Sequence, residues 1–318
     1  MKITIDCELT SALSVLQSQS ALAQLLAKGQ VVVVNMPLEA MVCEQYALSS
    51  SPDYPIAAIT AEADGLAVGD AYWLRAAPVH LALQRDCFSL SEPIPLQLAH
   101  EHAALMLTKL NAHFNQDGLS FLQGNSDAWY LKSAQSPQIK TTLPSVVVGK
   151  NIHQFLPQGV SSSSWLAVLN EVQMLLHEHP ANVAREAKGE AAVNSVWLSG
   201  GGVMPSVKTL PNDTSTLMAN SIFYQGLAKW AGLTCLALPN QLEAVLQKPQ
   251  QQVRLELLAT HDLDESWFSS LLAALKNHKI KQLTLNLGFY DKCLVVNLKP
   301  MDLYKFWRSA RPVMDYLQ

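Results

Sequence analysis

The sequence predicts an α/β protein in which a mixed sheet is flanked by helices, with a second α+β region inserted into the chain. Three observations favour this fold class. Short β-branched or alternating runs recur along the chain, and helical stretches separate them. The 318 residues also exceed the roughly 150 that one domain usually holds. Hydrophobic residues make up 49% of the chain, which is enough for a large core.

The first third of the chain begins with a strand and a helix. Residues 2–5 alternate as a strand does, and the apolar stretch 20–28 stops at Gly29, a typical helix end. Residues 31–34 are four consecutive valines, which favours a strand buried on both faces. The Ser- and Pro-containing stretch 47–55 indicates a loop.

The middle of the chain carries the elements of the predicted insertion. They are an aromatic-rich strand over 70–75, an amphipathic helix over 96–114, strands over 129–131 and 146–149, and a helix over 165–179. Pro180 is expected to end the last of these helices, because proline cannot continue a helix.

The last third alternates between strands and helices. The predicted elements are strands over 193–198, 233–238, 253–260, 281–287 and 293–298, and helices over 218–230, 267–277 and 301–308. We therefore expect residues 1–72 and 191–318 to form an α/β core, and residues 73–190 to form the inserted α+β domain.

Charge and composition exclude several classes of protein. The 22 Lys and Arg residues against 26 Asp and Glu give a net charge of −4, which argues against a nucleic-acid-binding surface. No uncharged apolar run approaches the roughly 18 residues of a membrane span. Asp6 stands where a signal peptide would need apolar residues, so we expect a cytoplasmic protein. The five cysteines are widely spaced and form no Cys-x-x-Cys pair, which favours reduced thiols over disulfides or zinc.

Two short motifs could hold an anion. Gly200, Gly201 and Gly202 follow a predicted strand, and backbone N–H groups exposed at such a turn can cradle a negative group. The alternative is a tight turn without a ligand. Arg75 and His80 lie at the end of another predicted strand, where the guanidinium could bind a carboxylate or phosphate and the imidazole could donate a proton. An internal salt bridge and a packed histidine are the alternative.

A third group of polar residues follows the helix predicted over 165–179. Asn182, Arg185 and Asn194 add hydrogen-bonding groups to a hydrophobic chain, either to line a polar pocket or to fix two layers together. The segments His100-Glu101-His102 and His177-Glu178-His179 lack the i, i+4 spacing of a helical zinc pair. No nucleophile elbow and no activated cysteine is evident.

Several segments resemble a bacterial family often labelled RpfE-type regulatory proteins. The segments that carry this resemblance are residues 73–81, 110–114, 117–119, 170–177 and 194–202. The resemblance covers most of the chain from about residue 60 onward. Because that family is largely uncharacterised, it implies a regulatory role without a mechanism.

A more distant similarity concerns the stretch from Trp197 to Pro205, a strand followed by glycines and a proline. It is similar to a stretch of the archaeal-type cofactor-independent phosphoglycerate mutases, members of the alkaline phosphatase superfamily. This resemblance implies an α/β core that holds two metal ions and an inserted domain that closes over a phosphorylated substrate. It places Asp6 near the first metal-binding aspartate.

The sequence departs from the mutase pattern at the positions of the metal ligands. Asp6 is followed by Cys7 rather than glycine, and Asn286 and Leu287 stand where the pattern has an Asp-His pair. A late Asp-Glu-x-x-His motif is matched only in part. His261, Asp262, Asp264 and Glu265 are present, but Ser266, Trp267 and Phe268 stand where the histidine of the motif should be. A two-metal site needs several such ligands together. We therefore expect no metal, no cofactor and no catalytic residues.

The sequence thus predicts a non-catalytic regulatory or ligand-binding protein, a degenerate relative of the mutases with a reduced alkaline-phosphatase-like core. Its expected ligand is a small anionic or phosphorylated metabolite, and neither nucleic acid nor membrane is an expected partner. The predicted ligand-binding residues are Arg75, His80, Asn182, Arg185, Asn194, Gly200, Gly201 and Gly202, in a pocket between core and insertion.

Two alternatives remain at this point. An active metal-dependent phosphoglycerate mutase or phosphatase would gather Asp6, His261, Asp262 and Asp264 at the carboxyl edge of one sheet. A structural interaction protein would instead expose a large apolar patch.

Overall fold

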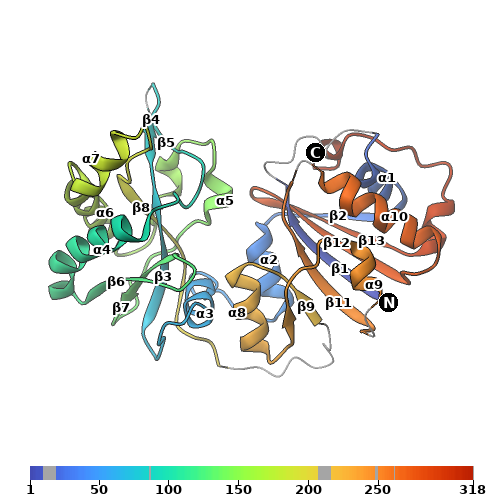
Figure 1. Cartoon of the computed structure of the whole chain (residues 1–318), viewed down its shortest axis with the longest axis horizontal. Helices are drawn as coiled ribbons and strands as arrows, with labels where there is room; N and C mark the ends of the chain where they lie inside the picture. Colours follow the sequence, from blue (N-terminus) through green and yellow to red (C-terminus); the bar gives the residue numbers. More distant parts are fainter. Residues whose placement is uncertain (10–18, 86, 207–215, 248–249, 261, 318) are drawn as a thin grey trace. The chain divides into compact units, whose positions relative to one another are not determined.

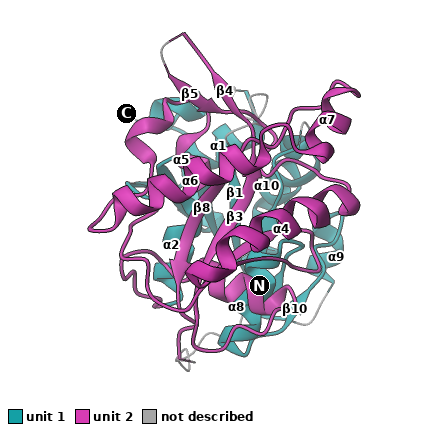
Figure 2. Ribbon diagram, turned by 90° about the vertical axis from the view of Figure 1, so that its left-hand side faces the viewer, with its two compact units in different colours: residues 1–46, 207–318 teal, residues 47–206 magenta. Residues whose placement is uncertain are grey.

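The structure is a computed structural model that describes residues 1–9, 19–85, 87–206, 216–247, 250–260 and 262–317. The chain folds into two units, shown in different colours in Figure 2. Unit 1 comprises residues 1–46 and 207–318, and unit 2 comprises residues 47–206.

Unit 1 is built on a mixed seven-stranded sheet with the order β10-β9-β11-β1-β12-β13-β2 (Figure 1). Its strands are β1 (Lys2–Glu8), β2 (Gln30–Val34), β9 (Thr216–Met218), β10 (Cys235–Leu236), β11 (Gln252–Leu257), β12 (Gln282–Phe289) and β13 (Lys292–Leu298). The first five strands of that order run parallel to one another, whereas β13 runs antiparallel to both of its neighbours, β12 and β2. Its helices are α1 (Ala21–Lys28), α2 (Leu38–Gln45), α8 (Ile222–Ala231), α9 (Leu242–Leu246) and α10 (Ser269–Lys276).

The two faces of this sheet differ in chemistry. Ile3, Ile5 and Cys7 of β1 point to one face, where they join the aliphatic side chains of α1, α9 and α10 in one hydrophobic core. Because side chains alternate along a strand, Thr4, Asp6 and Glu8 point to the opposite face. That second face meets α2 and α8, and it carries the polar residues described below.

Unit 2 contains a four-stranded antiparallel sheet with the order β6-β7-β3-β8 and a β4-β5 hairpin. Its strands are β3 (Tyr72–Val79), β4 (Leu81–Leu83), β5 (Phe88–Leu90), β6 (Leu119–Gln123), β7 (Trp129–Ser133) and β8 (Ser195–Gly202). Its helices are α3 (Ile56–Ala63), α4 (His100–Phe114), α5 (Pro144–Val147), α6 (Ser162–Leu176) and α7 (Pro180–Glu186). Core side chains of α4 and α6 pack on one face of the sheet and those of α3 on the other.

The predicted fold class is confirmed: unit 1 is an α/β unit with a mixed sheet, and unit 2 is an antiparallel α+β unit placed within its sequence. The limits of the units differ from the predicted boundaries at residues 73 and 190. β8 pairs with β3, and α3 packs against both strands, so residues 47–72 and 191–206 belong to unit 2.

Several local predictions are wrong for identifiable reasons. β2 is an edge strand, and Val32 and Val33 are 48% and 40% exposed rather than buried on both faces. Residues 144–147 form a helical turn that Pro144 begins, not a strand. Pro180 does not end a helix but opens α7, a position where its missing N–H costs nothing. The predicted final helix is a short 3₁₀ turn over Pro300–Tyr304.

No helix among the described residues has both the length and the apolar character that crossing a membrane requires.

Candidate functional site

Three neighbouring strands bring polar side chains together on the second face of the unit 1 sheet. Asp6 of β1 lies in register with Glu256 of β11 and with Asn286 of β12. Because these strands are parallel and in register, the three side chains share one face and lie side by side. They stand near the carboxyl ends of the strands, where open α/β sheets usually bind ligands.

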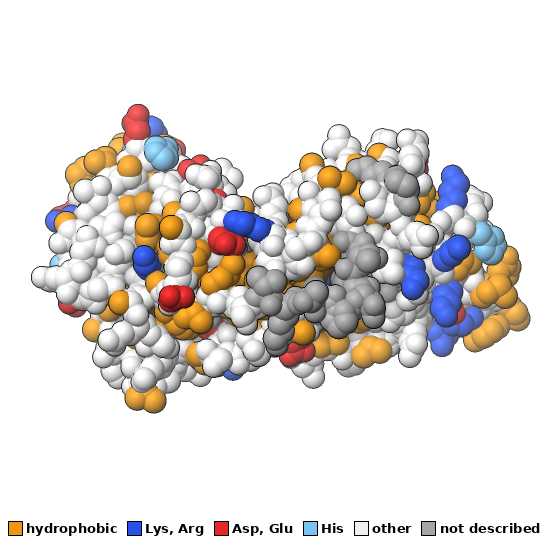
Figure 3. Space-filling model, turned by 90° about the horizontal axis from the view of Figure 1, so that it is seen from below, with side chains coloured by type: hydrophobic (Ala, Val, Ile, Leu, Met, Phe, Trp, Pro, Cys, Tyr) orange, Lys and Arg blue, Asp and Glu red, His pale blue; other side chains and the backbone are white. Residues whose placement is uncertain are grey.

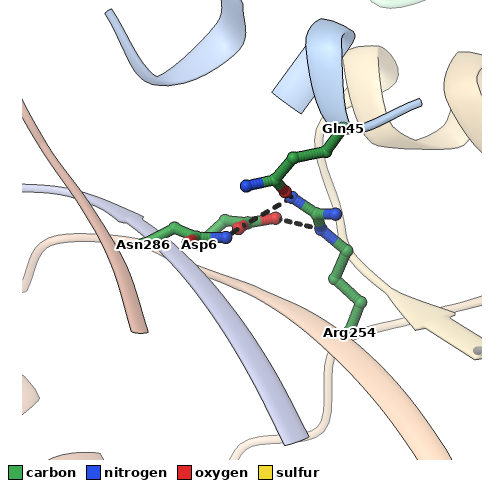
Figure 4. A network of polar contacts seen from close by, with 4 residues as sticks. All are labelled: Asp6, Gln45, Arg254 and Asn286. Atoms are coloured by element: carbon green, nitrogen blue, oxygen red, sulfur yellow. Dashed lines mark hydrogen bonds and ion pairs between the residues drawn. The ribbon is translucent and has the colours of Figure 1, made fainter. Parts of the chain in front are cut away.

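The centre of this group is an ion pair between Asp6 and Arg254 (Figure 4). The guanidinium Nε of Arg254 lies 2.5 Å from one carboxylate oxygen of Asp6, and its Nη2 lies 3.0 Å from the other. The side-chain amide of Asn286 donates to Asp6 at 2.7 Å, and Arg254 donates to Gln45 of α2 at 2.7 Å. Asp6 is fully buried and Arg254 nearly so, which makes this a closed internal network.

The surroundings of the pair favour its charged state. Burial is the largest single influence and would lower the pKa of Arg254, but the charge and hydrogen bonds of Asp6, together with Tyr224 and Tyr46, raise it overall. The Arg254 guanidinium also lies over the ring of Tyr46, 5.3 Å from its centroid, which adds a cation–π contact. Burial raises the pKa of Tyr224 well above its usual range, with Asp6 acting in the same direction. Tyr224 is therefore a neutral phenol beside the ion pair.

Two further carboxyl groups on this face are destabilised in their charged form. Burial raises the pKa of Glu8 to about 7, and the charge of Glu39 acts in the same direction. Burial also raises the pKa of Glu256, although hydrogen bonds from Ser221 and from the backbone of Asn220 oppose it. The backbone N–H of Ser221, the residue before α8, lies 3.0 Å from Glu256. Burial away from water favours the protonated form of a carboxyl group.

The residues present do not fit a divalent metal site. Both oxygens of Asp6 already accept hydrogen bonds, and the adjacent positive charge is a guanidinium. Oxygens of Glu8 and Asn286 are buried without a hydrogen-bond partner in the described part of the chain. However, no three His, Cys, Asp or Glu side chains among the described residues converge as a metal would require.

Asp264, which the resemblance to the mutases set among possible metal ligands, stabilises a helix instead. Its two carboxylate oxygens accept the backbone N–H groups of Ala21 and Leu22 at 2.8 and 2.9 Å. These N–H groups belong to the first turn of α1, which has no intrahelical acceptors for them. Asp262 is exposed, and His261 lies outside the described residues.

The residues predicted to bind a ligand all lie in unit 2, and four of their side chains form hydrogen bonds with backbone groups there. Asn182 donates to the carbonyls of Leu176 and Val193 and accepts from the N–H of Val193, each at 2.8 Å. Asn194 pairs in the same way with the N–H and carbonyl of Leu81. Both amide side chains thus act as internal bridges between segments.

Arg185 and His80 also meet partners inside unit 2. Arg185 is 4% exposed, donates to the carbonyls of Ala191 and Gln97, and lies 3.0 Å from a carboxylate oxygen of Glu190. His80 Nδ1 is 2.8 Å from the carbonyl of Ala192. Arg75 is half-buried on β3, beside Tyr130 and Ser199 of the neighbouring strands.

The three glycines lie inside β8 rather than at a turn beyond it, and Gly200 and Gly202 allow the start of α3 to approach. A Cβ atom on Gly202 would stand 2.7 Å from Pro55, and one on Gly200 would stand 2.9 Å from Ile56. The N–H of Gly201 hydrogen-bonds to the carboxylate of Asp53, which also accepts from Thr141. The Gly201 N–H, which the sequence suggested for binding an anion, therefore binds a carboxylate of the protein itself.

Comparisons with known proteins relate the chain to one group of enzymes. No family model matches it. It is 26% identical over 141 residues to the 2,3-bisphosphoglycerate-independent phosphoglycerate mutase of Methanosarcina barkeri, a match that covers 43% of this chain and 35% of the relative. A mutase of the same name from Methanosarcina acetivorans is 22% identical over 147 residues, covering 45% of this chain and 37% of the relative. The chain is a distant relative of these mutases.

A solved structure shares the fold over most of the chain. The PH0037 protein of Pyrococcus horikoshii matches with a TM-score of 0.50 and 11% identity, over 94% of this chain and 87% of that one. A cofactor-independent phosphoglycerate mutase from Thermoplasma acidophilum has a TM-score of 0.43 and 14% identity, over 94% and 90% of the two chains. The sequence match spans about a third of the length of the curated mutases.

Sequence reasoning identified Asp6 and Asn286 but missed Arg254 and Gln45. Arg254 is one of two charged residues, with Glu256, in the strand sequence Gln252–Leu257, and a charged residue rarely stays buried without a partner. That pattern could have drawn attention to it. No comparable signal marks Gln45, which ends an unremarkable helix.

Proposed function

We propose that this protein is a non-catalytic relative of the cofactor-independent phosphoglycerate mutases, with a regulatory or ligand-binding role. The observation that supports it most is the ion pair between Asp6 and Arg254. The resemblance sets Asp6 at the first metal position, and here a protein-borne cation neutralises that carboxylate in place of a metal ion. A guanidinium supplies charge but cannot act as an exchangeable Lewis acid.

Two other positions support the same proposal. Asn286 donates an N–H to Asp6 where the mutase pattern has an aspartate, and both oxygens of Asp264 are used to stabilise α1. The described residues therefore retain the strand framework of the relatives while their polar groups bind one another. The resemblance to RpfE-type proteins is the ground for the regulatory part of the proposal.

The ligand that we propose is a small anionic or phosphorylated metabolite. The relatives are named for a phosphorylated three-carbon acid, and an inactive descendant can keep recognition of an anion after it has lost the chemistry. Of the residues predicted from the sequence, Arg75 is the cation that suits this role best, because it is half-buried whereas Arg185 is almost completely buried.

Elemental analysis of the purified protein, grown with and without added manganese or zinc, tests the non-catalytic role. We expect well under one equivalent of either metal, no thermal stabilisation on adding them, and no interconversion of phosphoglycerates. The Methanosarcina barkeri mutase, assayed in parallel, is the positive control. About two equivalents of metal together with mutase activity would overturn the proposal and favour an active metal-dependent phosphoglycerate mutase or phosphatase.

A further inference from the structure

A cavity of about 460 Å³ opens on unit 1, at the edge of the sheet that β2 forms. The end of α1, the strand β2 and the segment that follows β13 line it together. The residues that matter for its chemistry are Leu26, Val31, Val33, Arg308, Arg311 and Tyr316. Its volume lies within the range of small-molecule sites in proteins. The cavity includes none of the ligand-binding residues predicted from the sequence.

The walls of this cavity are fixed by hydrogen bonds at the end of α1. Lys28 Nζ donates to the carbonyls of Lys305 and Arg308 at 2.8 and 2.7 Å. In return, Arg308 Nη1 donates to the carbonyl of Gly29 at 2.9 Å. Carbonyls at a helix C-terminus lack intrahelical partners and carry partial negative charge, so cations are stabilised there. The segment is therefore anchored, and the cavity needs little reorganisation to bind a ligand.

The C-terminal segment is basic although the whole chain has a net charge of −4. Between residues 299 and 311 it carries Lys299, Lys305, Arg308 and Arg311 against one acid, Asp302, which pairs with Lys305. In the part of the chain that the structure describes, neither Arg308 nor Arg311 forms an ion pair with a carboxylate. Figure 3 shows Lys and Arg side chains gathered at one end of unit 1, beside hydrophobic ones. The two arginines thus bring positive charge to the cavity that no described carboxylate neutralises.

One of these arginines is held in a definite plane. The guanidinium carbon of Arg311 lies 4.0 Å from the centroid of the Tyr316 ring, a close cation–π contact. Stacking on an aromatic ring leaves the N–H groups at the guanidinium edge available. A planar guanidinium edge suits two parallel hydrogen bonds to a phosphate or carboxylate.

Three other lining residues are apolar. They are Leu26 of α1, which is buried, and Val31 and Val33 of β2, of which Val33 is 40% exposed. Covering such exposed aliphatic surface with an apolar group is favourable. The cavity therefore combines a cationic wall with an apolar one, as a site for an organic anion does.

From this combination we infer that the cavity binds a small organic anion. Its phosphate or carboxylate group pairs with Arg308 and Arg311, and its compact apolar body lies against Leu26, Val31 and Val33. This inference rests on the proposed function, for which it names a site and a class of ligand. The site lies wholly within unit 1 and is distinct from the Arg75 region.

Isothermal titration calorimetry on the full-length protein tests the site, with inorganic phosphate, phenyl phosphate and benzoate as probes. We expect phenyl phosphate to bind more tightly than inorganic phosphate, because only the former has an apolar body. Arg311→Gln and Arg308→Gln should each weaken phenyl phosphate binding about tenfold or more, the usual cost of losing a charged hydrogen-bond donor. Lys276→Gln, which removes an exposed cation elsewhere on unit 1, should leave it unchanged. Benzoate binding as tightly as phenyl phosphate would identify the anion as a carboxylate and equally supports the site.

The outcomes separate this inference from the proposed function. If the protein binds phenyl phosphate and Arg75→Gln abolishes binding while the Arg308 and Arg311 variants do not, the site assigned here is wrong and the proposed binding role stands. Failure of all three probes to bind at millimolar concentration would overturn the site outright. Metal content with mutase activity would overturn the non-catalytic role, whatever the three probes do.

Discussion

Asp6 and Arg254 are 248 residues apart in the sequence and share two hydrogen bonds in the interior of unit 1. Moving either charge out of water is costly, and the attraction between them offsets that cost only while both are present. Asn286 and Gln45 satisfy further polar atoms of the pair. Removing either charge of the pair therefore leaves the other buried without its partner.

Arg254→Met should destabilise unit 1 strongly, because the variant leaves the carboxylate of Asp6 buried without its cation. Removing one partner of a buried pair typically costs about 3–5 kcal/mol. Urea denaturation at pH 7, followed by circular dichroism, measures the change. The double variant Asp6→Asn with Arg254→Met should recover part of the loss, since it removes both charges. If the single variant is as stable as the wild type, the ion pair does not contribute to the stability of unit 1.

The raised pKa of Glu8 predicts that the free energy of unfolding decreases as the pH rises. The pKa of Glu8 is about 7 in the folded protein against an ordinary 4.5, so the folded state binds more protons between these values. A tenfold difference in proton affinity between the folded and unfolded states is worth about 1.4 kcal/mol, and partial exposure reduces it. The free energy of unfolding should therefore fall by about 1–3 kcal/mol from pH 4.5 to 7.

Urea denaturation of the wild type and of Glu8→Gln at several pH values checks this prediction. The variant carries a neutral side chain at every pH, so it should lack this decline and be the more stable protein at pH 8. Glu243→Gln, at an exposed position on α9, is the matched control. Parallel profiles for wild type and Glu8→Gln would show that Glu8 titrates normally in the folded state.

At this scale the sequence predicts which residues are polar within apolar elements, but not what they contact. The sequence marks Asn182 and Asn194 as polar residues in a hydrophobic chain, and in the structure both bridge backbone segments. Choosing between a pocket and a structural network requires the partner, and each partner lies on another element. For Arg254 the partner is at the opposite end of the sequence.

Among the elements, α1 shows how a helical turn far along the chain, Asp264–Phe268, can determine a helix end. Ser20 is its N-cap and accepts the N–H of Ala23 at 3.0 Å, while Asp264 accepts the N–H groups of Ala21 and Leu22. A carboxylate also interacts favourably with the positive end of the helix.

Asp264→Ala should therefore lower stability by about 1–2 kcal/mol, the cost of losing a good N-terminal cap. Ser20→Ala should cost about 1 kcal/mol for the same reason. Thermal unfolding of both variants measures the effects, with Asp262→Ala, an exposed neighbour, as the control. An Asp264→Ala variant whose activity or metal content changed without loss of stability would instead favour a role for this residue in a metal site.

The packing of α3 on β8 depends on the absence of a side chain. Gly202→Ala would place a Cβ atom 2.7 Å from the Cα of Pro55, and backbone cannot move aside as a flexible side chain does. We expect a loss of about 1–3 kcal/mol or more, as for overpacked cores. Gly69→Ala, where the added atom meets open space, should cost only the strain of a left-handed residue, about 1–2 kcal/mol. Differential scanning calorimetry distinguishes the two, and equal shifts would show that close approach is not what Gly202 provides.

Elements with clear periodicity or clear ends could be predicted from the sequence, and those determined by tertiary context could not. β1, α1, β12 and β13 lie where their patterns indicate. α3 was missed because six of its eight residues are buried, so it lacks a polar face. The valines of β2 favour a central strand, yet their position at the edge follows from sheet order, which the local sequence does not encode.

On the scale of the whole molecule, each unit has its own hydrophobic core. The large core of unit 1 comprises residues from both of its chain segments, whereas the main core of unit 2 lies entirely within residues 72–198. A destabilising substitution in one core should therefore increase local unfolding in that unit and not in the other.

Hydrogen exchange followed by mass spectrometry tests this separation. Arg254→Met should speed exchange in β1, β11 and β12 and leave β3, β7 and β8 near wild-type rates, and Gly202→Ala should do the reverse. Uniform acceleration throughout the chain in both variants would mean that the units unfold as a single cooperative block.

The placement of β1 has a consequence for biosynthesis. β1 is made before unit 2 but lies between β11 and β12, whose residues begin at 252 and 282. As the chain leaves the ribosome, the 160 residues of unit 2 can complete their antiparallel sheet, because that sheet needs nothing from outside residues 47–206. Domains generally fold as units during synthesis, and β1 must meanwhile remain unpaired until β11 and β12 have been translated. A stalled or truncated ribosome product should therefore contain a protease-resistant unit 2 and an unfolded N-terminus.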